Sequence, residues 1–305
     1  MLTIRQESSQ PIEIDAGSEV RAVTFSANGE YFVSGDKKIQ MWRVDDWKEL
    51  ATIETEIVNC VAVSNDGNWI AAGTLWGDVI VWDAITFRLA FKHSKDGHIN
   101  SVDFSPDSTR LVSAGHKKAI VWDVVTCKQI QILRHGDYVT VVAAKYSPQG
   151  DRIATATGRS VQVWDSQNGR LLVDIKVEVI PRYNTGLLWF DDHLLVVSDD
   201  EIKEFDAYTG STVSKSPVPT SDYYSCIALP KHRAFIACST HRSLTLWDTS
   251  THSQLALIQQ PQDIRSIALS PDDHFIAIGG KDGKISINIV SRIFVSVLSC
   301  WIRHI

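Results

Sequence analysis

The sequence has few cysteines, and they are not arranged as a disulfide framework or a zinc ribbon would need. There are five, an odd number, and no two of them form a C-x-x-C pair. Disulfide-rich secreted domains and zinc ribbons both depend on such paired spacings. An N-x-S/T acceptor for N-glycosylation is also missing. We therefore expect an intracellular protein, cytoplasmic or nuclear.

Long hydrophobic runs are missing as well. The longest late one, residues 293–302, is about half of what a helix needs to cross a bilayer. The first ten residues lack the apolar core of a signal peptide. The sequence therefore predicts no membrane partner.

Motifs for catalysis and metal binding are absent too. The sequence has no G-x-S-x-G, no H-E-x-x-H and no G-x-x-x-x-G-K-S/T. Residues 279–284 (GGKDGK) resemble a phosphate loop, but their spacing is wrong and favours a strand hairpin. Cys238 and His241 lack the second pair that a metal site would need. The acidic pairs at 191–192 and 199–200 are interpreted as turn residues, with an acid/base or Ca²⁺ site as the alternative. We predict no cofactor and no metal.

The charges are nearly balanced, with 30 Lys and Arg against 36 Asp and Glu and a net charge of −6. A nucleic-acid-binding domain is usually basic, so no nucleic acid is predicted as a partner. Hydrophobic residues make up 44% and charged residues 22% of the chain, which excludes disordered, collagen-like and coiled-coil proteins.

What the sequence does contain is a repeat. Five tryptophans end short runs of β-forming residues, and four of them are followed by aspartate. Phe205 and Asn288 fall at the same spacing, so seven units recur at intervals of 40 to 42 residues. The five tryptophans are Trp42, Trp82, Trp122, Trp164 and Trp247.

A second marker has the same period. Turn motifs rich in Pro, Asn, Asp and Gly begin at Ser26, Ser64, Ser105, Ser147 and Ser270. Each unit contains several short strands, which in the third unit span 99–104, 110–114, 119–122 and 129–133. Seven four-stranded units can close into a ring, which hides their sheet edges. The predicted fold class is all-β, a seven-bladed β-propeller of four-stranded antiparallel blades.

With its Trp-Asp pairs, Ser-Pro-Asp turns and period near 41, the chain resembles the WD-repeat β-propeller family over roughly residues 11–300. More weakly, the stretch GKISINIVSRIFVSV is similar to the ends of WD-repeat proteins of filamentous fungi. The resemblance implies a platform for protein partners. It also implies that the last blade is completed by a strand from the other end of the chain.

We divide the chain into a polar N-terminal segment (1–10), a propeller (11–292) and an apolar tail (293–305). Residues 11–15 are favoured as the closing outer strand, and residues 293–301 are the alternative. With the first choice, the tail packs outside, continues into a further segment or is disordered. Because such repeats often sit beside other domains, the chain can be part of a larger multidomain protein or complex.

The WD-repeat family often has a His–Ser/Thr–Asp–Trp hydrogen-bond network in each blade, and no unit here has the complete set. The third unit has Ser113 and Trp122, but His116 stands where Asp is expected. The fourth has His135 but no Asp in its turn at 158–159. We therefore expect stability to depend mainly on apolar packing between blades.

One column of the aligned units consists of small residues. Inner strands converge on the propeller axis, where only small side chains fit, so the two cysteines in this column are interpreted as buried and inert rather than reactive. The column is Ala22, Cys60, Ser101, Ala143, Gly186, Cys226 and Ser266.

A partner-binding surface is predicted from loop residues. In the resembling family, partners commonly dock on the face formed by the loops that enter the first strands and by the turns between second and third strands. Tyr, Trp and Arg most often contribute interface energy. For each aromatic, the alternative is that it caps a blade. The predicted surface is Trp76, His98, Tyr138, Tyr183, Tyr223, Arg21 and Arg265.

The predicted function is that of a non-catalytic scaffold that binds a protein or peptide. One alternative is a propeller enzyme with an axial site, which would need acidic or histidine side chains converging on the axis. The other is a phosphopeptide or modified-histone reader, in which Arg21 and Arg265 would clamp an anion across the ring closure. All three rest partly on analogy between folds.

Overall fold

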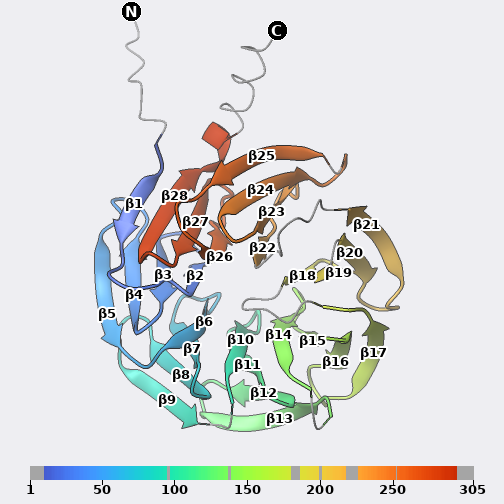
Figure 1. Cartoon of the computed structure of the whole chain (residues 1–305). Helices are drawn as coiled ribbons and strands as arrows, with labels where there is room; N and C mark the ends of the chain where they lie inside the picture. Colours follow the sequence, from blue (N-terminus) through green and yellow to red (C-terminus); the bar gives the residue numbers. More distant parts are fainter. Residues whose placement is uncertain are drawn as a thin grey trace, which may run out of the picture.

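A computed structural model describes residues 10–94, 97–136, 139–179, 186–198, 201–217, 226–251 and 253–293. Seven antiparallel sheets of four strands each are arranged in a ring (Figure 1). The predicted seven-bladed propeller is therefore confirmed. We number the blades 1 to 7 in chain order.

The strands of the first four blades follow one another without interruption. Blade 1 consists of β2 (Ala22–Phe25), β3 (Tyr31–Gly35), β4 (Lys38–Arg43) and β5 (Glu49–Glu54). Blade 2 consists of β6 (Val58–Val63), β7 (Trp69–Thr74), β8 (Asp78–Asp83) and β9 (Leu89–Ser94). Blade 3 consists of β10 (Ile99–Phe104), β11 (Arg110–Gly115), β12 (Lys118–Asp123) and β13 (Lys128–Arg134). Blade 4 consists of β14 (Val141–Tyr146), β15 (Arg152–Thr157), β16 (Ser160–Asp165) and β17 (Leu171–Lys176).

The last three blades complete the ring. Blade 5 consists of β18 (Leu187–Phe190), β19 (His193–Ser198), β20 (Glu201–Asp206) and β21 (Thr212–Pro217). Blade 6 consists of β22 (Cys226–Ala228), β23 (Phe235–Ser239), β24 (Ser243–Asp248) and β25 (Gln254–Gln259). Blade 7 consists of β26 (Ile264–Leu269), β27 (Phe275–Gly280), β28 (Lys284–Ile289) and, from the other end of the chain, β1 (Ile12–Asp15).

The repeated serine turns have a direct physical cause. Each serine hydroxyl accepts a hydrogen bond from the backbone N–H five residues later, which fixes the turn between the first and second strands. The five bonds are 2.8 to 3.2 Å long and join Ser26 to Tyr31, Ser64 to Trp69, Ser105 to Arg110, Ser147 to Arg152 and Ser270 to Phe275.

The aspartate after the repeated aromatic residue, which is a tryptophan except for Phe205 in blade 5, fixes the turn between the third and fourth strands. In blades 2, 3 and 5, its carboxylate accepts bonds from the backbone N–H and the hydroxyl of the threonine three residues later. These bonds favour the charged carboxylate, so they lower the pKa of Asp83, Asp123 and Asp206 below its usual range.

The residue that ends this turn has a left-handed backbone. Blades 4 and 5 place Gly169 and Gly210 there, whereas blades 1 and 3 place Trp47 (φ 61°) and Cys127 (φ 59°). A side chain in this conformation costs about 1 to 2 kcal/mol. Packing on the preceding blade offsets that cost, since the Trp47 ring lies edge-on to Phe275 of blade 7, with ring centroids 5.0 Å apart.

The ring is closed by the N-terminal strand, the choice favoured from the sequence. Strand β1 pairs with β28 in antiparallel register, with Ile14 opposite Ile285. The chain continues from β28 into a helical turn at residues 290–293. The rest of the apolar tail, residues 294–305, lies outside the described residues.

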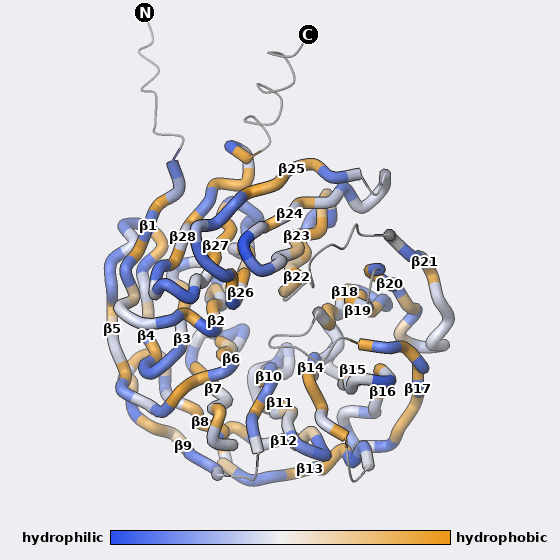
Figure 2. Tube along the Cα trace, in the orientation of Figure 1, coloured by the Kyte–Doolittle hydropathy of each residue, from blue (hydrophilic) through white to orange (hydrophobic). Residues whose placement is uncertain are grey.

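The hydrophobic core is divided among the junctions between blades. One cluster joins Val81 and Phe91 of blade 2 to Val102, Ile120 and Trp122 of blade 3. Seven such clusters occur in the described part of the chain, and hydrophobic residues are accordingly spread around the whole ring (Figure 2). This distribution agrees with a fold stabilised by apolar packing between blades.

Candidate functional site

The propeller axis is lined by the column of small residues predicted from the sequence. An axial cavity of about 300 Å³ is bordered by six of its seven members, namely Ala22, Cys60, Ser101, Ala143, Cys226 and Ser266. At the seventh, Gly186, an added Cβ would come within 2.4 Å of a Val197 methyl carbon. At Gly186, neighbouring side chains therefore leave no room for a larger residue.

Polar atoms of this column join one blade to the next. Each bond runs between a column side chain and the backbone of the neighbouring blade, so these groups serve ring assembly. The bonds are Cys60 Sγ to Ile99 O (3.8 Å), Ser101 Oγ to Ala144 O (3.2 Å), Cys226 Sγ to Arg265 O (3.2 Å) and Val23 N to Ser266 Oγ (3.1 Å). Burial raises the pKa of Cys60 to about 12, which keeps it a neutral thiol.

A second row of side chains, one position before the column, makes the same kind of link. The Asn59 amide donates to the Ile99 carbonyl at 3.0 Å, and the Asn100 amide donates to the Val141 carbonyl at 3.0 Å. Arg265 is the member of this row in blade 7, and its Nε donates to Glu19 at 2.6 Å. Glu19 precedes blade 1, so this contact crosses the ring closure.

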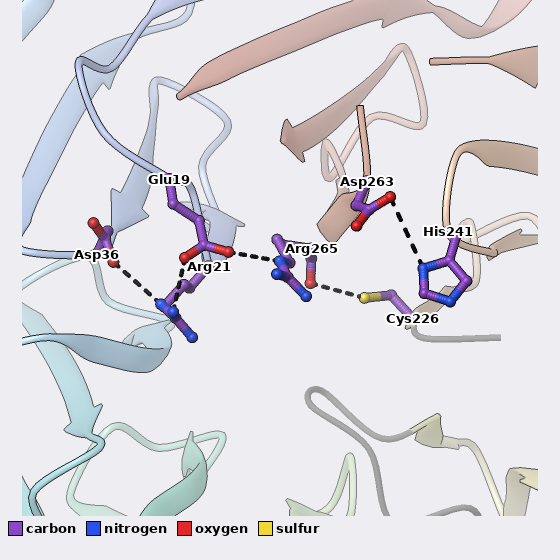
Figure 3. Close-up of polar contacts among 7 residues, drawn as sticks. All are labelled: Glu19, Arg21, Asp36, Cys226, His241, Asp263 and Arg265. Atoms are coloured by element: carbon purple, nitrogen blue, oxygen red, sulfur yellow. Dashed lines mark hydrogen bonds and ion pairs between the residues drawn. The ribbon is translucent and has the colours of Figure 1, made fainter. Parts of the chain in front are cut away.

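The two arginines of the predicted surface meet on one carboxylate (Figure 3). Glu19 bonds Arg265 through one oxygen and Arg21 through the other, at 2.7 Å. Arg21 also pairs with the buried Asp36 at 3.2 Å. Two carboxylates thus balance the two guanidinium groups. A phosphate bound here would have to compete with Glu19 for the same donors.

Trp76 and His98 both lie at the junction of blades 2 and 3, on the end of the ring that we call the top face. Trp76 lies in the turn between β7 and β8, and 67% of its surface is exposed. The Thr74 hydroxyl accepts hydrogen bonds from the backbone N–H groups of Trp76 and Asp78, at 3.3 and 2.9 Å. The exposed His98 ring contacts the Leu75 carbonyl through Nδ1.

The other three residues of the predicted surface cannot be placed. Tyr138, Tyr183 and Tyr223 lie outside the described residues. The structure therefore places His98 against the residue before Trp76, and it places Arg21 and Arg265 on the same carboxylate, Glu19. The binding role of all seven residues stays a prediction.

Comparison with known families agrees with the repeats and the blade order. The WD domain, G-beta repeat family matches residues 10–43, 47–83, 89–123, 127–165 and 253–287. These five segments cover more than half of the sequence. The chain belongs to the WD40-repeat family.

Three relatives illustrate the range of this WD40 similarity. The small ribosomal subunit protein RACK1 of Drosophila melanogaster is 30% identical over 130 residues, 41% of this chain and 40% of the relative. The transcriptional corepressor LEUNIG_HOMOLOG of Arabidopsis thaliana is 20% identical over 305 residues, 93% of this chain and 38% of the relative. The human pre-mRNA-processing factor 17 is 27% identical over 159 residues, 48% of this chain and 28% of the relative.

The chain thus spans about 40% or less of the length of these relatives. They come from an insect, a plant and a human, so the similarity to fungal WD-repeat proteins stays a prediction.

One WD40 blade holds three of the four members of the family's hydrogen-bond network. In blade 4, the Trp164 indole donates to the Thr155 hydroxyl at 2.8 Å, and that hydroxyl lies 2.7 Å from His135 Nε2. His135 Nδ1 lies 3.1 Å from the Leu133 carbonyl, which can only accept. Nδ1 therefore carries the proton, and Nε2 accepts from the threonine. This series of hydrogen bonds from Trp164 to Leu133 is therefore complete without the turn aspartate of the family network.

Blade 6 shows what happens when the hydroxyl is absent. Ser34, Ser113 and Thr155 accept bonds from their blade's tryptophan, each at 2.8 Å. Cys238 takes the equivalent position in blade 6, and it is fully buried. The buried indole nitrogen of Trp247 has no hydrogen-bond partner among the described residues. Cys238 therefore belongs to the blade interior and does not form a ligand pair with His241.

The His135 chain predicts a pH dependence of stability. Burial lowers the pKa of His135 from its ordinary value to about 4. As pH falls, the unfolded chain gains a proton near pH 6.5 while the folded protein does not. The free energy of unfolding should thus decrease by about 2 to 3 kcal/mol between roughly pH 7.5 and pH 4.

Urea unfolding at several pH values checks this, with a His135→Gln variant as the control. Glutamine can accept from Thr155 but does not titrate, so its curve should fall less steeply with acid. If the free energy of unfolding falls equally with pH in the two proteins, His135 has the same pKa in the folded and the unfolded state, and the prediction is wrong.

The acidic pairs at 191–192 and 199–200 are the remaining candidates for an acid/base or metal site. Asp191 forms an ion pair with Arg233 of blade 6, and residues 199–200 lie outside the described part. Among the described residues, no three His, Cys, Asp or Glu side chains gather as a metal site would require. None of the described helical residues form a helix long and apolar enough to span a membrane.

Proposed function

We propose that this WD40 propeller is a non-catalytic scaffold that binds a protein or peptide on its top face, with Trp76 and His98 at the centre of the contact. The observation that carries the proposal is the exposure of Trp76. Its turn is held by Thr74 through backbone bonds, so the turn itself does not need the indole. An exposed tryptophan on a fixed turn is the type of side chain that most often dominates an interface.

The position of His98 supports the same proposal. Its ring is fixed against the Leu75 carbonyl, one residue before Trp76. A ring held at a strand end beside an exposed tryptophan turn offers a preorganised contact, which lowers the entropy cost of binding. The names of the relatives add support, since ribosomal, corepressor and pre-mRNA-processing proteins act with other macromolecules. They also support a cytoplasmic or nuclear location, which we propose for this chain.

Arg21 and Arg265 have a different proposed role. Because Glu19 and Asp36 already pair with them, we propose that they hold the ring closed beneath the partner. The anion-clamp alternative is tested by replacing both arginines with alanine. If the double variant binds a phosphopeptide as well as the native chain does, the anion-clamp alternative is wrong.

The scaffold proposal is tested by affinity capture from extract of the source cells, read by quantitative mass spectrometry. The baits are the native chain and a Trp76→Ala/His98→Ala variant. Removal of an interface tryptophan commonly costs 2 kcal/mol or more. We therefore expect captured partners to fall by roughly tenfold or more with the variant.

Val125→Ala is the matched control bait. Val125 is 74% exposed, but it lies in the turn between β12 and β13, at the opposite end of the strands. Capture should be unchanged with this bait. Equal capture by all three baits would move the contact away from the top face, and specific capture by none would refute the scaffold role.

A further inference from the structure

The top end of each blade places the first residue of its third strand opposite the last residue of its outer strand. In blades 1 and 7 both of these residues are charged, and their charges are opposite, as expected for directly facing cross-strand neighbours. Blade 3 is different because it pairs two cations. The three pairs are Lys38 with Glu54 in blade 1, Lys284 with Asp15 in blade 7 and Lys118 with Arg134 in blade 3.

The two cations of blade 3 are not neutralised by a carboxylate among the described residues. Lys118 is half-buried and Arg134 is exposed. No carboxylate of the described residues lies at ion-pair distance from either side chain, although 15 other ion pairs are present there. Strand β13 itself, with the sequence KQIQILR, contains no acidic residue. Like charges that face each other directly reduce stability, whereas opposite charges in the same register favour it.

We propose that Lys118 and Arg134 form a binding site for a carboxylate-rich segment of a partner protein. Directly opposite residues have Cβ atoms about 5 Å apart, so one acidic side chain can reach both cations. The arginine supplies a bidentate fork and the lysine a compact charge. Two cations on a chain with a net charge of −6 suit a short acidic segment better than a long polyanion such as a nucleic acid.

The cation pair is continuous with the proposed contact around Trp76 and His98. His116, two residues before Lys118, packs on Gly97, where an added Cβ would come within 2.9 Å of its Cβ. Gly97 precedes His98, whose ring contacts the residue before Trp76. A single partner can therefore cover the rings and the cations together. In this respect the inference rests on the proposed function, whereas carboxylate binding at the pair can be measured alone.

The test uses fluorescein-labelled octaglutamate as the probe and fluorescence anisotropy in about 50 mM NaCl, where screening is weak. The native chain should bind it, with an affinity that falls as salt is added. Arg134→Glu and Lys118→Glu should each raise the dissociation constant by roughly fivefold or more. Arg134→Glu also recreates the Lys–Glu pair of blade 1, so it should fold at least as stably as the native chain.

Lys128→Glu is the matched control, because it makes the same charge change at the other end of β13. It should leave octaglutamate binding within about twofold of native. Absence of binding by the native chain, or an equal loss with Lys128→Glu, would overturn the proposal. Tighter binding of a single-stranded oligonucleotide of equal charge would overturn the choice of a carboxylate-rich protein.

The outcome is separable from that of the scaffold test. Trp76→Ala should not change octaglutamate binding, since the ring does not touch the cation pair. If the Trp76→Ala/His98→Ala bait keeps its partners while Arg134→Glu loses octaglutamate, the proposed face is wrong and the acidic site stands. The reverse result leaves the face and removes the acidic site.

Discussion

An Ile14→Asp variant is expected to lose about 5 kcal/mol of unfolding free energy or more, enough to unfold many proteins of this size. Ile14 is 6% exposed and packs in a cluster with Phe32 and Trp42 of blade 1 and Ile285 of blade 7. The substitution removes a buried side chain, which costs about 2 to 5 kcal/mol. It also places an unpaired carboxylate among apolar atoms, which adds several more.

The effect should be localised at the ring closure. Without β1, the outer edge of β28 loses its pairing, so the amides of Ile285 and Ile287 should exchange with deuterium much faster. Urea unfolding measures the free energy, because thermal unfolding of a chain this long is often irreversible.

Glu13→Lys provides the control for the closing strand. Glu13 is exposed and lies next to Ile14, with its side chain on the other face of β1. It should change the unfolding free energy by less than about 0.5 kcal/mol. If Ile14→Asp has an equally small effect, β1 does not hold the ring closed and another segment does.

The fold was predictable because the two repeated markers act locally. The Ser64 hydroxyl reaches the backbone of Trp69, five residues later, and the Asp83 carboxylate reaches Thr86, three residues later. Such short-range bonds depend on the sequence alone, whatever the rest of the chain does. A period set by them therefore reveals the number of blades directly.

The ring closure was harder to predict because two segments had suitable patterns. Residues 11–15 and 293–301 both alternate well enough to form an edge strand. The choice depends on which segment reaches β28, a property of the assembled ring. The left-handed turn residues were also missed, since Trp47 stands where glycine would be expected.

The sequence indicated which types of residue form the candidate site, but it did not indicate which partners they contact. Arg21 and Arg265 were selected because arginine is common in interfaces. Their shared partner Glu19 depends on closure, which joins residues 246 positions apart. The facing cations Lys118 and Arg134 were missed, although aligning the units by strand register would have revealed two like charges where other blades have opposite ones.

Trp122→Ala is expected to lower the unfolding free energy by about 4 kcal/mol. The Trp122 side chain is 2% exposed, its ring stacks on His93 of blade 2 at 4.6 Å, and its indole donates to Ser113 at 2.8 Å. Alanine would leave a cavity at the junction of blades 2 and 3 and would remove a donor from a buried hydroxyl. Urea unfolding at neutral pH measures the loss.

Two further variants separate the contributions. Trp122→Phe keeps most of the ring but loses the donor, so it should cost about 1 to 2 kcal/mol. Trp76→Ala makes the same chemical change as Trp122→Ala at a side chain that is 67% exposed, and it should stay within about 0.5 kcal/mol of native. A large loss with Trp76→Ala would mean that its ring supports the fold, and the argument that its exposure serves a partner would fail. A small loss with Trp122→Ala would show that blades 2 and 3 are held together mainly by their backbone links at the axis.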